Sequence, residues 1–249
     1  TVFMKNFKLT IEYDGSRYSG WQRLGKGEST NTIENKIKEV LKKMSGRDVE
    51  LFCGSRTEAG VHAYGQVISC KLDTDLSAAK VRQYLNRYLP MDIAVLEAEE
   101  MPERFHAALN ARSRTYVYRV AIGDVPSVFE RKYTYYCFGR PDVSTMKEAA
   151  ALLKGTHDFA AFSTAKKSKS TVRTITDLEI YADDKELQIT ITANDFLHNM
   201  ARLIASTLLD IGLGKRPVSD IPAIFDPKAP AEVSVPADPQ GLFLERVDY

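Results

Sequence analysis

The 249-residue chain has only three cysteines, and nothing in their spacing would pair them or bind a metal. Cys53, Cys70 and Cys137 lie far apart and form no C-x-x-C motif. Disulfides and zinc are therefore not expected, and the reducing cytoplasm fits best. The four histidines share no ligand spacing, and none stands in an H-x-x-x-H pattern, so we expect no metal.

Long apolar runs and phosphate-binding motifs are also lacking. No apolar run approaches the roughly 20 residues of a membrane span, so we expect no membrane partner and no secretory signal. There is no P-loop, no G-x-G-x-x-G after a strand and no G-x-S-x-G. A nucleotide cofactor and a serine hydrolase are thus unsupported, and we expect no cofactor. The net charge of +1 neither predicts nor excludes a nucleic-acid partner, because a local basic stripe matters more.

Hydrophobic periodicity predicts α and β structure in two similar halves. The first half reads β-α-β-β-α-β, the ferredoxin-like order, with strands at 7–13, 49–56, 65–73 and 92–96 and helices at 33–44 and 81–89. The second half repeats the pattern, with strands at 116–121, 173–181, 187–193 and 241–247 and helices at 146–153 and 196–209.

The fold class expected from this pattern is α+β. We expect two ferredoxin-like halves, residues 1–104 and 105–249, that share one mostly antiparallel sheet and leave a cleft between them.

The most informative segment runs from Gly54 to Ala63, between two apolar strands. Its turn carries Arg56, Thr57 and Glu58, whereas simple connectors favour Asn, Asp, Gly or Pro. Glu58 is therefore either half of a solvated ion pair with Arg56 or a carboxylate kept ionised as a nucleophile or base.

Other residues also have both a structural and a functional interpretation. Tyr116 and Tyr118 share one face of a strand, where they would pack in the core or stack on a base. Arg202 would cover the core with its stem or pair with a buried carboxylate. Basic residues with interleaved aromatics would suit a phosphate-lined cleft with stacking surfaces; they include Arg17, Arg23, Arg112, Arg114 and Arg173, with Tyr13, Tyr18 and Trp21.

Six motifs, in order along nearly the whole chain, resemble those of the TruA family of tRNA pseudouridine synthases. They are Ile11 to Gly15 with Tyr18, Gly20, Trp21 and Gln22; Arg56 to His62, similar to R-T-D-A-G-V-H; Phe105-His106-Ala107 with Tyr116 and Tyr118; Gly155 to Phe159, similar to G-x-H-D-F; Ala193 to Arg202; and Gly241-Leu242 with Leu244.

The resemblance implies an active cleft between the two halves, with the catalytic residues in the first half and the cleft completed by the second. It also implies a homodimer that binds tRNA and converts uridine to pseudouridine in the anticodon arm, without cofactor or metal. It places Glu58 at the catalytic aspartate, with Arg56 beside it and Arg202 as the arginine that pairs with the carboxylate. Tyr116 would stack on the base and Leu242 would lie under it.

Further contacts follow from the same resemblance. Thr57 and His62 stand in the catalytic motif and are expected to help bind the substrate. Residues 17–26 and 163–170 read as basic, polar and unanchored, so RNA contacts are expected from Arg17, Arg23, Arg114, Lys166, Lys167 and Lys169.

The chain departs from the family pattern at Glu58, where the family has aspartate; Ser55, Ala108, Asn199 and Ser206 depart as well. An extra methylene moves the carboxylate by about 1 Å, and a misplacement of that size can cost roughly 100-fold in rate. Two hypotheses follow: an active enzyme whose pocket fits glutamate, or a catalytically silent RNA-binding or RNA-folding protein. Retention of Arg56, Tyr116 and Arg202 favours the enzyme. A metal- or nucleotide-dependent RNA-modifying enzyme has almost no residue support.

Overall fold

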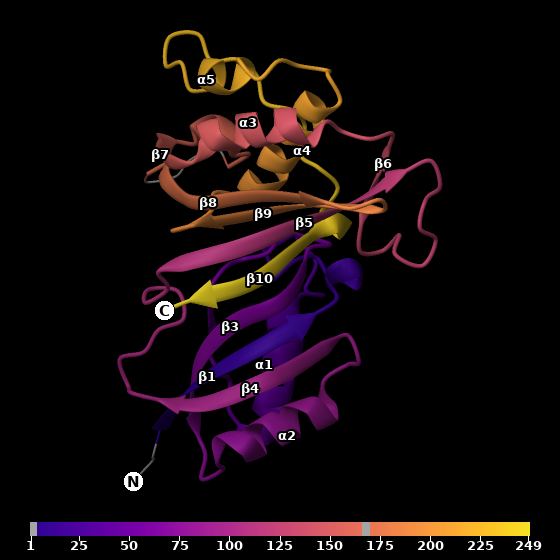
Figure 1. The fold of residues 1–249 in the computed structure, drawn as a ribbon. Helices are drawn as coiled ribbons and strands as arrows, with labels where there is room; N and C mark the ends of the chain where they lie inside the picture. Colours follow the sequence, from indigo (N-terminus) through magenta and orange to yellow (C-terminus); the bar gives the residue numbers. More distant parts are fainter. Residues whose placement is uncertain (1–3, 166–169) are drawn as a thin grey trace. The chain divides into compact units, whose positions relative to one another are not determined.

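The structure is a computed structural model that describes residues 4–165 and 170–249. These residues form a mixed α+β fold with ten strands and five α-helices (Figure 1), which confirms the predicted class. The chain divides into two compact units, residues 1–112 with 244–249 and residues 113–243. The last strand, β10 (Leu242–Asp248), begins in the second unit and ends in the first.

The first unit contains its elements in the predicted order: β1 (Met4–Tyr13), the 3₁₀ helix η1 (Gly15–Arg17), α1 (Ile33–Ser45), β2 (Phe52–Cys53), β3 (His62–Asp73), α2 (Ala78–Tyr88) and β4 (Ile93–Met101). Strand β1 pairs antiparallel with β3 on one side and with β4 on the other, and β2 pairs with β3. Helix α2 contacts α1 and packs along β4.

Local sequence explains where the helices of this unit begin and end. Helix α1 begins at Thr32, whose Oγ1 accepts the N–H of Asn35 at 3.2 Å, and ends at Gly46 in the left-handed region. Helix α2 begins after the cap Ser77 and ends before Pro90, as predicted. Their apolar faces are buried, so the helices cover the core instead of extending into solvent.

The second unit contains β5 (Ser113–Gly123), β6 (Tyr135–Phe138), α3 (Val143–Leu153), β7 (Gly155–Asp158), the 3₁₀ helix η2 (Ala160–Phe162), β8 (Val172–Ala182), β9 (Glu186–Ala193), α4 (Met200–Gly212), α5 (Asp220–Ile224) and the 3₁₀ helix η3 (Pro239–Gly241). Strands β5, β9, β8 and β7 pair antiparallel in that order, and β6 runs parallel to β5. Helix α3 packs on α4 and β8, and Figure 1 shows both helices on one side of β8 and β9.

Several elements differ from the prediction. Strands β6 and β7 have four residues each and α5 has five, too few to show a hydrophobic period. Helix α4 begins at Met200 and not at residue 196, because Asn199 has φ 61°, a left-handed conformation that cannot belong to the helix. The strand expected at 49–56 is only Phe52–Cys53, because Ser55 bonds to a side chain of β3 instead of continuing the ladder. In the described residues, no helix is long and apolar enough to cross a membrane.

Candidate functional site

Arg56, Thr57 and Glu58 lie in the turn between β2 and β3 of the first unit. Arg56 is exposed, Glu58 is partly buried and Thr57 is buried. The N–H of Val61 donates to the carbonyl of Glu58 at 3.1 Å, and Gly60 has φ 79°. The turn is therefore tight, with Arg56 at the surface and the hydroxyl of Thr57 bonded to Tyr13 in the interior.

A buried hydrogen-bond network holds this turn from below. The hydroxyls of Tyr13 and Thr57 lie 2.7 Å apart, and Gln66 Nε2 donates to the Tyr13 oxygen at 3.4 Å and to the carbonyl of Ser55. Gln66 Oε1 accepts the N–H of Ser55 at 3.3 Å and that of Val67 at 3.2 Å. Burial raises the pKa of Tyr13, so its hydroxyl keeps its proton and can donate to Thr57.

The segment after β1 holds the turn from the side. The N–H of Trp21 donates to the carbonyl of Thr57 at 2.9 Å, and the N–H of Gly60 donates to that of Tyr18 at 3.3 Å. Gly20 has φ 90°, and a Cβ there would lie 2.9 Å from the Thr57 carbonyl oxygen. Residues 18–21, although distant from Glu58 in sequence, thus fix the backbone on either side of it.

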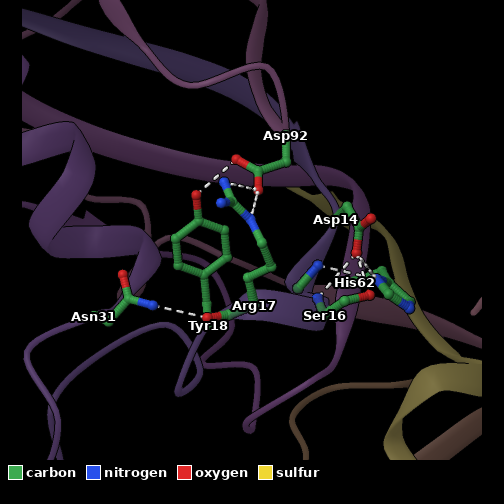
Figure 2. Close-up of polar contacts among 8 residues, drawn as sticks. Asp14, Ser16, Arg17, Tyr18, Asn31, His62 and Asp92 are labelled. Carbon is green, nitrogen blue, oxygen red and sulfur yellow. Dashed lines mark hydrogen bonds and ion pairs between the residues drawn. The ribbon is translucent and has the colours of Figure 1, made fainter.

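His62, at the start of β3, is buried and committed to this frame (Figure 2). Its Nδ1 accepts the N–H of Gly15 at 2.9 Å, and Asp14 Oδ1 lies 3.2 Å from the same nitrogen. Both contacts are to residues at the start of η1. His62 therefore fixes the start of η1 beside β3.

The expectation that residues 17–26 are unanchored is wrong for residues 17–21. Arg17 contacts Asp92 Oδ2 through Nε at 2.8 Å and Nη2 at 2.6 Å, and the Tyr18 hydroxyl donates to Asp92 Oδ1 at 2.6 Å (Figure 2). The bond to Asp92 raises the pKa of Arg17, while burial and then Asp92 raise that of Tyr18 to about 12. Arg23 is exposed and bonds to the carbonyl of Lys26. Tyr13, Tyr18 and Trp21 are buried, so they form core rather than stacking surface.

The catalytic and base-binding candidates of the second unit lie on β5, α4 and β10. Tyr116 is buried on β5, with its ring edge-to-face to Phe196 at 4.8 Å between centroids. Arg202, in the first turn of α4, donates from Nε to the carbonyl of Ala237 at 2.6 Å and from Nη1 to Asn199 Oδ1 at 3.1 Å. Leu242 is buried at the first position of β10.

Two further candidates, Tyr118 and Arg114, are buried. Tyr118 is core, with its hydroxyl on the Asp238 carbonyl at 2.8 Å. Arg114, expected to bind RNA, is buried; it donates to the Asn194 carbonyl at 2.6 Å and lies 3.8 Å from Asp195. Lys166, Lys167 and Lys169 lie outside the described residues.

Nothing in the described part of the chain resembles a metal centre or a reactive thiol. No group of three or more His, Cys, Asp or Glu is placed to hold a metal ion in residues 4–165 and 170–249. All three cysteines are buried free thiols, and burial raises the pKa of Cys70 to about 12.

The sequence reasoning missed Gln66 and Asp92 as parts of the site's frame. Gln66 left a signal, because a glutamine inside an apolar strand must find partners for its amide when buried. Asp92 left none, since its partner Arg17 precedes it by 75 residues.

We expect Gln66→Leu to lower the melting temperature, because it leaves the buried N–H and C=O of Ser55 without their partner. Each unsatisfied buried group costs about 1–3 kcal/mol, and each kcal/mol lowers the melting temperature of a protein this size by roughly 2–4 °C. Calorimetry measures the shift, and hydrogen exchange should quicken at residues 55–60. Gln83→Leu, on the exposed side of α2, is the control. Equal melting temperatures for the two variants would refute the role of Gln66.

Comparisons with known proteins agree with the ordered motifs. A family model described as tRNA pseudouridine synthase matches residues 9–122 and 149–249. The chain is 44% identical over 247 residues to tRNA pseudouridine synthase A 2 of Bacillus anthracis, covering 99% of this chain and 100% of that protein.

More distant relatives carry similar names. The chain is 42% identical to tRNA pseudouridine synthase A of Bacillus sp. (strain KSM-64) and 39% identical to tRNA pseudouridine synthase A 2 of Clostridium perfringens (strain 13 / Type A). Each alignment spans 247 residues, 99% of this chain and 100% of the relative. The similarity is therefore to whole proteins and not to one shared module.

Proposed function

This chain belongs to the tRNA pseudouridine synthase family and is a tRNA pseudouridine synthase, and we propose that Glu58 is the carboxylate that carries its reaction. The observation that carries the activity is the end-to-end match, 44% identical over 99% of this chain and 100% of the relative. Nothing in the described residues favours the silent RNA-binding alternative over the enzyme.

The reaction needs a carboxylate at the sugar and a way to hold a detached base. The C1′–N1 bond breaks and a C1′–C5 bond forms, while C5 loses a proton to water and N1 gains one. A carboxylate can start this by attacking the sugar or by removing a sugar proton. Glu58 suits the task because its backbone is fixed on both sides while its side chain is only partly buried. The target uridine must first leave its stack.

The other roles in the proposal follow the family motif. Arg202 would keep the carboxylate anionic, with Arg56 beside it in sequence, and α4 gives Arg202 a rigid base. Tyr116 would stack on the uracil and Leu242 would support it, with Thr57 and His62 shaping the turn from within. Each half would be ferredoxin-like, and the described order β1-α1-β2-β3-α2-β4 supports this for the first.

Loss of tritium provides the direct test of activity. Unmodified tRNA transcripts carrying tritium at uridine C5 release it to water only when C5 becomes bonded to the sugar. Release by the pure protein, with the modified position mapped afterwards, is the expected result. Binding without release on any transcript would instead favour the silent binder.

We propose a uridine of the anticodon arm as the target, RNA contacts from Arg23 and the 163–170 segment, and the cytoplasm as the compartment.

We also propose a homodimer. Four large apolar residues of the second unit are exposed, in the β5–β6 connection and on β6: Val125, Val128, Phe129 and Phe138. Exposed apolar residues gathered in one region commonly mark protein–protein interfaces. They support a second copy of this chain as the partner.

Phe129→Asp is expected to convert the dimer to monomer, because it places a charge where the second copy would pack. Sedimentation equilibrium measures the mass, and Tyr181→Asp, an exposed aromatic on β8, is the control. An unchanged dimer in Phe129→Asp would remove this region from the interface.

A further inference from the structure

The first unit has a groove of about 370 Å³ beside α1. One wall is a single stripe of α1, formed by Lys36, Glu39, Val40 and Lys43. Residues spaced i, i+3, i+4 and i+7 share one face of a helix, so both lysines project on the same side. The helix thus presents two cations and one carboxylate to whatever occupies the groove.

The other walls come from the segment after β1 and the end of α2. Arg17, Tyr18 and Asn31 (Figure 2) line the groove as well, as do Tyr88 and Pro90. The ring of Tyr88 is half-exposed at 51%. The groove therefore combines cationic, amide and aromatic groups.

The charged groups that line the groove differ in whether they have an ion-pair partner. Arg17 is bound by Asp92, and Lys36 Nζ lies 4.0 Å from Glu39. In the described part of the chain, no carboxylate lies within ion-pair distance of Lys43, whereas its neighbour Lys42 contacts Asp48 at 2.8 Å. The amine of Lys43 is therefore the lining cation without a carboxylate partner in the described residues, and an anion in the groove could also draw Lys36 from Glu39.

Size and chemistry together indicate the class of ligand. A volume of about 370 Å³ is at the lower end of small-molecule sites, roughly 300–1,000 Å³, and suits one nucleotide. Ammonium groups bind phosphate, and an exposed tyrosine ring stacks on any base without sequence preference. A mostly polar groove of this kind fits a phosphate-bearing nucleotide better than an apolar ligand.

The groove is also joined to the candidate catalytic turn. Tyr18 is one of the residues that line the groove, and its backbone carbonyl accepts the N–H of Gly60, two residues after Glu58. A ligand against Tyr18 therefore touches the segment that holds the turn.

We propose that this groove binds one phosphate-bearing nucleotide of the tRNA substrate, other than the uridine that reacts, with Lys43 as its phosphate contact. The proposal rests on the proposed function, because it takes tRNA as the substrate. It adds a subsite on α1 that the family motifs do not include.

The test compares Lys43→Gln with Lys42→Gln in the full-length protein. The two variants remove the same charge from adjacent exposed positions of one helix, so they match in net charge; Lys42→Gln also removes the ion pair with Asp48. The dissociation constant for a tRNA transcript is measured from 50 to 300 mM KCl, and kcat and KM are measured by tritium release. Titration with AMP alone separates tRNA from a free nucleotide as the ligand.

Lys43→Gln is expected to weaken tRNA binding by about 3–5-fold near 0.1 M salt and to reduce the slope of log affinity against log salt by about 0.7–0.9. KM should rise with kcat unchanged, and Lys42→Gln should match the wild type. Equal tRNA affinities for the two variants, in a wild type that releases tritium, would overturn the groove and leave the enzyme's function intact. So would a Lys43-dependent affinity for AMP without any effect on tRNA. A wild type without tritium release would refute the function instead.

Discussion

Glu58→Gln is expected to abolish pseudouridine formation, by about 10³-fold or more, while tRNA affinity changes little. The amide is nearly isosteric with the carboxylate, so the turn should keep its hydrogen bonds to Trp21 and Val61, which involve only backbone atoms. An amide is a far weaker nucleophile and base, and loss of a catalytic nucleophile costs orders of magnitude in kcat. Single-turnover tritium release measures the chemical step.

The control is Glu50→Gln, the same change at an exposed position just before β2. It should leave the rate unchanged. A Glu58→Gln protein that turns over at the wild-type rate would show that another group starts the reaction. Glu58→Asp, which would complete the R-T-D-A-G-V-H pattern that this turn resembles, should be slower than wild type, because a pocket fitted to glutamate holds the shorter carboxylate about 1 Å short, which can cost up to roughly 100-fold. A faster Glu58→Asp would mean that the pocket still fits aspartate.

Elements with a strong local signal could be predicted from the sequence. Helices α1 and α2 have apolar residues on one face, a Thr or Ser cap and a Gly or Pro after the end, and they lie within a few residues of the prediction. The β8–β9 hairpin followed from its turn, where Asp183 Oδ1 accepts the N–H of both Lys185 and Glu186 at 2.8 Å. Such features depend on neighbours in sequence, so the sequence alone reveals them.

The frame of the candidate site depends on distant partners and was largely hidden. Arg17 reads as a free cation because Asp92 is far along the chain. Arg114 likewise reads as a surface charge from the sequence, but its guanidinium donates a hydrogen bond to the carbonyl of Asn194. The motif located the turn, yet groups that fix it, such as the backbone of Tyr18 and Trp21, come from tertiary packing. Local sequence patterns thus identify the candidate reactive residues better than they identify the groups that position those residues.

Gly15→Ala should be the most damaging single-methyl change in the first unit. A Cβ at residue 15 would lie 1.9 Å from the carbonyl oxygen of Val61 and 2.7 Å from its carbonyl carbon. Backbone atoms cannot rotate away, so η1 must move off β3 and lose the 2.9 Å bond from Gly15 N–H to His62. Overpacking of this kind costs about 1–3 kcal/mol or more.

The melting temperature of Gly15→Ala should therefore fall by about 2–12 °C. Its rate, measured at a temperature where the variant stays folded, should fall by up to about 100-fold, because η1 leads directly into the backbone that holds the Glu58 turn. Gly27→Ala is the matched control, since a Cβ there meets nothing within 4 Å. Calorimetry and tritium release on both variants separate the two effects. If Gly15→Ala lost stability but kept its full rate, the packing of η1 would matter for folding alone, and the turn would hold Glu58 without it.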